Sequence, residues 1–170
     1  MNYQMCKENV MEITKKPSDF ESNILTAAKE GKLTSVQWFV EQCHVDVETK
    51  SNNGCTPIYI ASQNGHLEVV KYLHEECHAD IETKDKYGRT PIYIASQNGH
   101  LEVVKYLHEE CHADVETKDI DGRTPIWFAS HNGHLSVVKY LHEECHAVIT
   151  EATIRGARNE EIRSYLRSHR

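Results

Sequence analysis

The sequence predicts an all-α repeat solenoid, in which short helix-turn-helix units, each followed by a β-hairpin loop, are stacked in a line. The segments Thr56–Arg89 and Thr90–Arg123 are identical at 31 of 34 positions. Thr124–Ala147 matches Thr90–Ala113 at 20 of 24 positions, and Ser22–Cys55 is a weaker copy in the same register. A fixed period of roughly 20–50 residues is the signature of stacked repeats, because each unit can bury its apolar face only against its neighbours.

Each unit begins with a first helix whose two ends are marked in the sequence. Thr56 is a good N-cap, because its hydroxyl can accept a hydrogen bond from a free backbone N–H of the first turn. Pro57 suits the first helical position, where its missing N–H costs nothing. We expect this helix to cover about 58–63 and to end at Asn64-Gly65, since glycine tolerates the left-handed conformation that closes many helices.

A second helix and a polar loop complete the unit. Leu67, Val70 and Leu73 recur at three-residue spacing and form an apolar stripe on a helix from about His66 to Glu75. The stretch 80–89 is too polar for a helix, and residues 85–88 have the composition of a tight turn. The sequence therefore predicts a hairpin loop after each second helix.

These motifs resemble the ankyrin repeat. The family's T-P-L-H-x-A opening corresponds to TPIYIA at Thr90–Ala95, its G-H-L-x-V-V helix to Gly99–Val104, and its A-D-V-x-x-K-D-x-x-G hairpin to Ala113–Gly122. The resemblance covers the chain from about Ser18 to its C-terminus. It implies stacked helix pairs whose loops and first helices form a concave surface for binding other proteins.

Two features depart from the family pattern. The period is 34 residues rather than about 33, with the extra residue near Glu76-Cys77-His78. The histidine of T-P-L-H is replaced by Tyr59, Tyr93 and Trp127. The hydrogen bond that this histidine usually makes between turn and helix therefore does not follow from the resemblance.

The repeat register divides the chain into six segments. They are a polar N-terminal segment (1–17), repeat 1 as an N-terminal cap (18–55), repeat 2 (56–89), repeat 3 (90–123), repeat 4 (124–149) and an Arg-rich C-terminal helical cap (150–170). Ser18-Asp19-Phe20-Glu21 has the pattern of a capping box, so we expect the first helix of repeat 1 to begin there. Its inward-facing residues would be Phe20, Ile24, Leu25 and Ala28.

The last copy loses the hairpin pattern after Ala147. Two short helices are expected instead, at 151–157 and 160–167, with Ile154, Ile162, Tyr165 and Leu166 buried. The five arginines of this cap suit either a solvated end with cations near helix C-termini or a docking patch for an acidic partner.

Composition argues against several functional classes. The net charge is −7, whereas binding to duplex nucleic acid requires dense positive patches. No run approaches the roughly 20 apolar residues of a membrane span, and the N-terminal MNYQMCKENV lacks the apolar core of a signal peptide. We expect a monomer in the cytoplasm or nucleus that binds neither nucleic acid nor membrane.

Four of the six cysteines, Cys43, Cys77, Cys111 and Cys145, recur with the 34-residue period. Equivalent atoms of stacked repeats lie about 10 Å apart, whereas a disulfide needs Cα atoms roughly 4.4–6.8 Å apart. We therefore expect reduced thiols, as in a reducing compartment, that fill the junctions between units as small buried side chains.

The segment His74-Glu75-Glu76-Cys77-His78 matches H-E-x-x-H, the zinc-protease signature. It recurs at 108–112 and 142–146, and three copies at the repeat period indicate duplication rather than three active sites. The second histidine should leave the helix, and a catalytic zinc needs a third ligand and an open position. We expect no catalytic residue, cofactor or metal site, and retain a metal-binding or zinc-dependent protein as the alternative.

The differences between copies gather at the hairpin tips and on the first helices, and aromatic and apolar side chains there are of the types that dominate binding energy. The candidate partner-binding residues are Asn52, Asn53, Cys55, Gln63, Lys86, Tyr87, Arg89, Gln97, Ile120, Asp121, Arg123, Trp127 and His131. We expect a non-catalytic protein–protein interaction module or scaffold that binds an unidentified protein across its concave face. Free drift of surface positions is the other explanation of these differences, and a structural spacer without a partner is the second alternative function.

Overall fold

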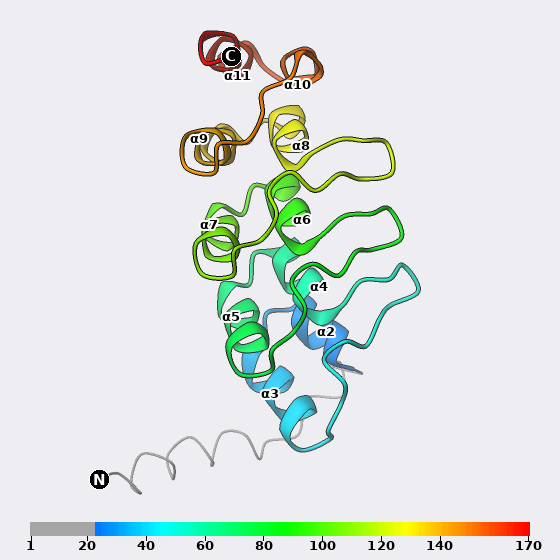
Figure 1. Ribbon diagram of the computed structural model, residues 1–170. Coiled ribbons are helices and arrows are strands. Elements are labelled where there is room, and N and C mark those ends of the chain that lie inside the picture. Colours follow the sequence, from blue (N-terminus) through cyan, green and yellow to red (C-terminus); the bar gives the residue numbers. More distant parts are fainter. Residues whose placement is uncertain (1–22) are drawn as a thin grey trace, which may run out of the picture.

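The computed structural model describes residues 23–170, and Figure 1 shows them as an elongated stack of helix pairs. The first column contains α2 (Ile24–Lys29), α4 (Pro57–Asn64), α6 (Pro91–Asn98), α8 (Pro125–Asn132) and α10 (Glu151–Gly156). The second column contains α3 (Leu33–Glu41), α5 (Leu67–Glu75), α7 (Leu101–Glu109), α9 (Leu135–Glu143) and α11 (Glu160–Ser168). Each first-column helix packs on the next one and on the helix that follows it in the chain. The predicted all-α repeat solenoid is confirmed.

Three long loops project from the first column, one before each of α4, α6 and α8 (Figure 1). We call them finger 1 (49–55), finger 2 (83–89) and finger 3 (117–123). The prediction of β-hairpins was wrong in one respect, because these fingers are tight turns and no strand occurs within 23–170. Neighbouring fingers share single backbone hydrogen bonds, from Lys86 N–H to the Asn53 carbonyl and from Ile120 N–H to the Tyr87 carbonyl, which is too few for a strand ladder.

The apolar core runs as one seam between the two columns. Val70 and Leu73 of the predicted stripe are fully buried, and Leu67 packs against the seam while partly exposed. Equivalent side chains continue the seam through every unit, ending at Ile154, Ile162 and Leu166. Burial of one such side chain contributes about 1.5–3 kcal/mol, but only if the neighbouring unit covers it.

The helix ends follow the predicted pattern in part. Gly65, Gly99 and Gly133 close the first helices with φ of 76°, 80° and 91°, which confirms the Asn-Gly stop signal. The Thr56 hydroxyl accepts from the Tyr59 N–H at 3.4 Å, as expected. The equivalent Thr90 and Thr124 make no side-chain cap bond, so that part of the prediction was wrong.

The two ends of the chain differ in how well they were predicted. The described first helix of repeat 1 begins at Ile24 rather than Ser18, because the Asn23 side chain accepts from the Thr26 N–H at 2.9 Å and caps it. Residues 1–17 and the proposed capping box at 18–21 lie outside the described residues. At the other end, α10 and α11 confirm the two short helices that replace the last hairpin.

Successive units are joined at the Asn-Gly-His segments. The carbonyl of Gln63, at the end of α4, accepts from Asn98 Nδ2 at 2.8 Å and from His100 Nε2 at 3.0 Å. The carbonyl of Gln97 accepts from Asn132 Nδ2 at 2.7 Å and His134 Nε2 at 3.0 Å. These carbonyls are among the groups that a helix leaves unsatisfied at its C-terminus, so each unit completes the hydrogen bonding of the one before it.

A second set of bonds joins the second-column helices. The hydroxyl of Tyr106 donates to Glu75 at 2.9 Å, and that of Tyr140 donates to Glu109 at 2.8 Å. Tyr165 of α11 repeats the bond to Glu143 at 2.7 Å. The C-terminal cap is therefore attached to the stack by the same contact that joins the repeats.

The junction geometry makes a prediction about glycine. Gly99 and Gly122 have nearly the same φ, 80° and 77°, but a Cβ at Gly99 would lie 2.5 Å from His134 Nδ1, while one at Gly122 would meet nothing within 4 Å. We predict that Gly122→Ala costs about 1 kcal/mol from backbone strain. Gly99→Ala should cost about 2–3 kcal/mol, because His134 must also leave its carbonyl partner. Urea unfolding measures both, and equal costs would contradict this account of the junction.

Candidate functional site

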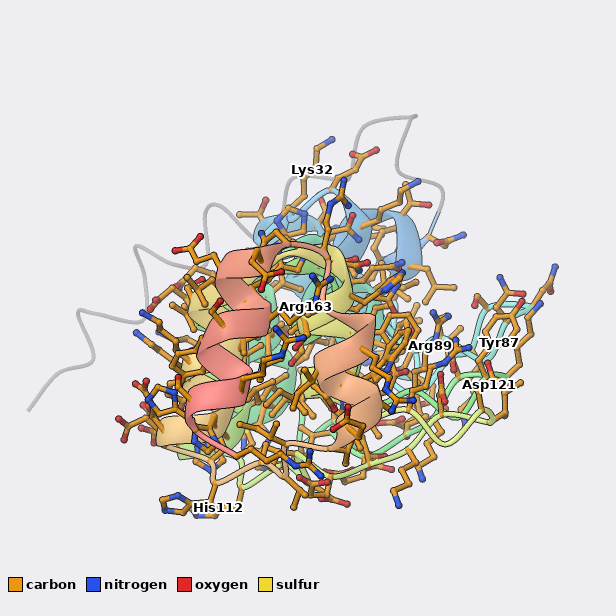
Figure 2. The ribbon with its side chains drawn as sticks, turned by 90° about the horizontal axis from the view of Figure 1, so that it is seen from above. Lys32, Tyr87, Arg89, His112, Asp121 and Arg163 are labelled. Atoms are coloured by element: carbon orange, nitrogen blue, oxygen red, sulfur yellow. The ribbon has the colours of Figure 1, made fainter. Side chains whose placement is uncertain are left out.

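The structure places the candidate binding residues on the fingers and the first-column helices. Asn52, Asn53, Lys86, Tyr87, Ile120 and Asp121 are at the finger tips, Cys55, Arg89 and Arg123 are at the finger bases, and Gln63, Gln97, Trp127 and His131 are on α4, α6 and α8. Figure 2, which looks along the stack, shows Tyr87, Arg89 and Asp121 together on the finger side and His112 away from them.

The finger tips expose large apolar side chains. Tyr87 is 43% exposed and Ile120 is 70% exposed, on neighbouring fingers. Two cations lie over the Tyr87 ring, with Lys86 Nζ 5.0 Å and the Arg89 guanidinium carbon 4.8 Å from its centroid. Such cation–π contacts contribute about 0.5–1 kcal/mol at exposed sites. They orient the ring of Tyr87 while leaving much of its surface accessible.

The base of finger 2 is fixed by the buried carboxylate of Asp85. Its Oδ2 accepts from the Tyr59 hydroxyl at 2.9 Å and from Arg89 Nε and Nη2 at 2.9 and 2.7 Å. Its Oδ1 accepts from the backbone N–H groups of Tyr87 and Arg89 at 2.9 Å each. The guanidinium of Arg89, one of the candidate binding residues, therefore helps to hold the finger in shape.

Tyr59 occupies the position of the family's histidine, and its hydroxyl bonds the helix α4 to Asp85 at the base of finger 2. This bond joins a helix to a turn, as the family's histidine usually does. Tyr93 repeats it in the next unit, donating to Asp119 at 2.8 Å. Sequence reasoning missed both aspartates, although their recurrence immediately before a variable tip was a usable signal. Burial raises the pKa of both tyrosines, so their hydroxyls stay protonated and able to donate.

The carboxyl of Asp85 has a lowered pKa. Burial alone would raise this pKa, but the hydrogen bonds from Arg89, Tyr59 and the backbone outweigh burial and hold it below its ordinary value. The group is therefore charged at neutral pH, where it can anchor the finger.

The third finger differs in the place of its arginine, which lies over Trp127. The Arg123 guanidinium lies 4.8 Å from the Trp127 ring and pairs with Asp121 at 3.3 Å. The Trp127 indole N–H donates to the Ala152 carbonyl at 3.2 Å. His131 stacks on Trp127 and places its Nδ1 3.0 Å from the Gly156 carbonyl. Trp127 and His131, both candidate binding residues, thus contact α10 as well as the finger side.

The His-Glu-Glu-Cys-His copies straddle the end of the second helix, as predicted. His74 lies in the last turn of α5, whereas His78 follows the helix with a left-handed φ of 54°. The three copies do not converge, and residues 23–170 contain no group of three or more His, Cys, Asp or Glu placed to hold a metal ion.

The cysteines differ from expectation in one place. Cys77, Cys111 and Cys145 are partly buried against the core, but Cys43 is exposed. The three partly buried thiols lie beside a tyrosine of their own helix and a glutamate of the preceding unit. In repeat 1 the tyrosine position holds Trp38, and the part of the chain that the structure describes provides no preceding unit to cover Cys43. Burial raises the pKa of Cys111 and Cys145 to about 11, which makes them poor nucleophiles at neutral pH.

Stacked helix pairs with a row of projecting turns define a repeat protein of the solenoid class. The family model for ankyrin repeats in three copies matches residues 24–119, and a model for ankyrin repeats in many copies matches residues 100–142. The chain belongs to the ankyrin repeat family. A comparison with curated protein sequences finds no significant match.

Membership of this family indicates a general class of function. Ankyrin repeats are generally protein–protein interaction modules and are typically non-catalytic. Within 23–170, no helix combines the length and the apolar character needed to cross a membrane.

The anchoring of finger 2 predicts a pH effect. The folded-state pKa of Asp85 is below its unfolded value near 3.9, so its stabilisation is fully present above about pH 4 and is lost as the pH falls through the folded-state pKa. We predict that Asp85→Asn costs about 2–4 kcal/mol at pH 7 and flattens the loss of stability between pH 5 and about pH 2. Urea unfolding across this range provides the measurement, with Asp121→Asn in the exposed tip of finger 3 as the matched control. An unchanged pH slope in Asp85→Asn would contradict the assignment.

The buried thiols predict a slow alkylation. Between about pH 8 and pH 10, the rate of iodoacetamide addition to Cys111 should keep rising about tenfold per pH unit in the folded chain. In urea, the rate should level off above a pH of about 8.5, the ordinary thiol pKa. Peptide mapping by mass spectrometry distinguishes the two profiles. A plateau near pH 8.5 in the folded chain would show that the thiol is not desolvated.

Proposed function

We propose that this chain is a non-catalytic binding module that holds a protein partner across its finger tips and the adjoining faces of α4 and α6. The observation that carries the proposal is the pair of large apolar side chains, Tyr87 and Ile120, exposed on neighbouring fingers. Because Ile120 N–H bonds to the Tyr87 carbonyl, the two side chains lie on adjacent tips and form an apolar patch of the kind that marks interaction sites. Tyrosine is also among the residues that contribute most to binding energy at protein interfaces.

The fingers favour this function because they are fixed before binding. Ile120 N–H donates to the Tyr87 carbonyl at 3.0 Å, which couples the two exposed residues directly. The bases of fingers 2 and 3 are tied to the helices through Tyr59–Asp85 and Tyr93–Asp119. A preorganised surface loses little conformational entropy when a partner binds.

The side chains at the finger tips indicate what kind of surface a partner would present. Tyr87 and Ile120 offer an apolar centre, and Lys86 places a positive charge over Tyr87, beside the Arg89 guanidinium that is paired with Asp85. We therefore propose a protein partner with an apolar contact rimmed by acidic side chains, rather than nucleic acid or membrane. We further propose that the chain acts as a monomer in a reducing compartment, the cytoplasm or the nucleus, where its five described free thiols would stay reduced.

Truncation of the two exposed side chains tests this proposal. In affinity capture from the native cell, Tyr87→Ala combined with Ile120→Ala should weaken partner binding about 30-fold or more, since each hot-spot truncation costs about 1–2 kcal/mol. The matched control is His78→Asn with His112→Asn, which changes two exposed residues on neighbouring units outside the fingers. Asparagine is chosen because it tolerates their left-handed backbone.

The outcomes separate the proposal from its alternative. A partner that the parent chain and the histidine control capture, but the finger variant does not, supports the finger-tip site. Equal capture by all three proteins contradicts it. If none of the three captures a partner under conditions that preserve the fold, a structural spacer is the better description.

A further inference from the structure

The row of fingers stops one unit before the row of helices does. Eleven positions separate Ala113 from Thr124, the cap of α8, but three separate Ala147 from Thr150, the cap of α10. Even so, α10 packs on α8 as α8 packs on α6. Repeat 4 thus leads into the next first-column helix without the finger that should come before it, and Figure 1 shows the short connection between α9 and α10.

The place of the omitted finger is an open cleft of about 460 Å³, which we call the finger-4 gap. Its walls come from finger 3, from Trp127 of α8 and from the segment 148–153. A Cβ on Gly54 or Gly88 would lie 3.4 Å from the backbone of the following finger, whereas one on Gly122 would meet nothing within 4 Å. The outer edge of finger 3 is therefore uncovered, in contrast to those of fingers 1 and 2.

The backbone bonding between fingers is also left incomplete at this edge. Lys86 N–H donates to the Asn53 carbonyl at 2.9 Å, and Ile120 N–H to the Tyr87 carbonyl at 3.0 Å. The repeat register makes the Asp121 carbonyl the next acceptor, and no donor from residues 23–170 reaches it. A second type of bond between units does continue to the end of the stack. The Glu82 side chain accepts from the Asp114 N–H, and in the same way the Glu116 side chain accepts from the Val148 N–H at 2.8 Å. At finger 3 the contacts of the repeat thus continue near the helices but stop at the tip, where the Asp121 carbonyl has no partner within 23–170.

We infer that the finger-4 gap binds an extended, turn-forming segment of a partner protein, which lies along finger 3 as a fourth finger and donates a backbone N–H to the Asp121 carbonyl. This inference rests on the proposed function, because it gives the shape of the same protein partner. The charges lining the gap balance, with Lys118 and Arg123 against Glu116 and Asp121. Val148 is 59% exposed in the gap, and Trp127 also lines it. An apolar side chain next to the donated N–H therefore fits better than a strongly charged one.

A second copy of the chain does not fit this gap. Its finger 1 could offer the Asn52 N–H, which has no acceptor within 23–170. In the repeat register, however, α4 of that copy directly follows its finger 1 and would fall where α10 of the first copy already packs on α8. The occupant is therefore a segment with no helix immediately after it.

A peptide copied from the chain itself can serve as a probe for this site. The outer edge of finger 2 is covered by finger 3, which together with the preceding Glu116 has the sequence ETKDIDGR (116–123). A synthetic ETKDIDGR hairpin, closed by a disulfide between added terminal cysteines, is titrated into the ¹⁵N-labelled chain. We expect saturable shifts of the Gly122 and Arg123 amides and of the Trp127 indole N–H. N-methylation of the peptide isoleucine, which removes the donor to the Asp121 carbonyl, should weaken binding at least about tenfold.

Two variants make the result decisive. Insertion of the same eight residues between Ile149 and Thr150 restores finger 4 and should abolish the shifts, with circular dichroism confirming that the stack is intact. Val148→Lys changes a single exposed wall residue without rebuilding the loop and should weaken binding of the peptide. Absence of shifts at millimolar peptide, or the same shifts in the insertion variant, overturns the inference.

The captured partner separates this inference from the proposed function. Loss of the partner on truncation of Tyr87 and Ile120, but not on insertion of finger 4, leaves the proposed function standing and overturns the gap as its site. Loss with both variants supports both. Loss on insertion alone supports the gap and contradicts the finger-tip site.

Discussion

The architecture depends on one contact, in which the histidine of repeats 2, 3 and 4 bonds to the C-terminal end of the first helix before it, joined in repeats 3 and 4 by an asparagine. His100 and Asn98 share the Gln63 carbonyl, and His134 and Asn132 share that of Gln97. The glycine between the asparagine and the histidine closes its own helix through its left-handed φ and leaves room for the histidine ring of the following unit. Helix termination and unit stacking therefore have the same physical origin, and neither can be altered alone.

The proposed function depends on the separation of this junction from the finger tips. The junction and the core seam are built from residues that the copies share, whereas the tips carry Lys86, Tyr87, Ile120 and Asp121, where the copies differ. Asp85 and Asp119 connect the two regions by tying each tip to a buried tyrosine. A repeat scaffold can thus change what it recognises without changing what keeps it folded.

The sequence predicted the fold well because its signals were local and repeated. Thr-Pro, Asn-Gly and the apolar spacing of 66–75 each specify one helix end or face, and the period places the units in register. What could not be predicted depended on contacts between distant residues. The bond from Tyr59 to Asp85 spans 26 positions, and Trp127 reaches the Ala152 carbonyl across 25. Cys43 looked like the other periodic cysteines, but its exposure depends on which neighbour covers it.

The near-identity of repeats 2 and 3 also has a mechanical consequence. The contacts at Gln63 and Gln97 involve the same atoms at distances that agree within 0.1 Å. The carbonyl contacts that join α4 to α6 and α6 to α8 are therefore equivalent in geometry. At these carbonyls a load applied through a bound molecule would meet the same resistance in both joints, so this contact creates no preferred hinge between them.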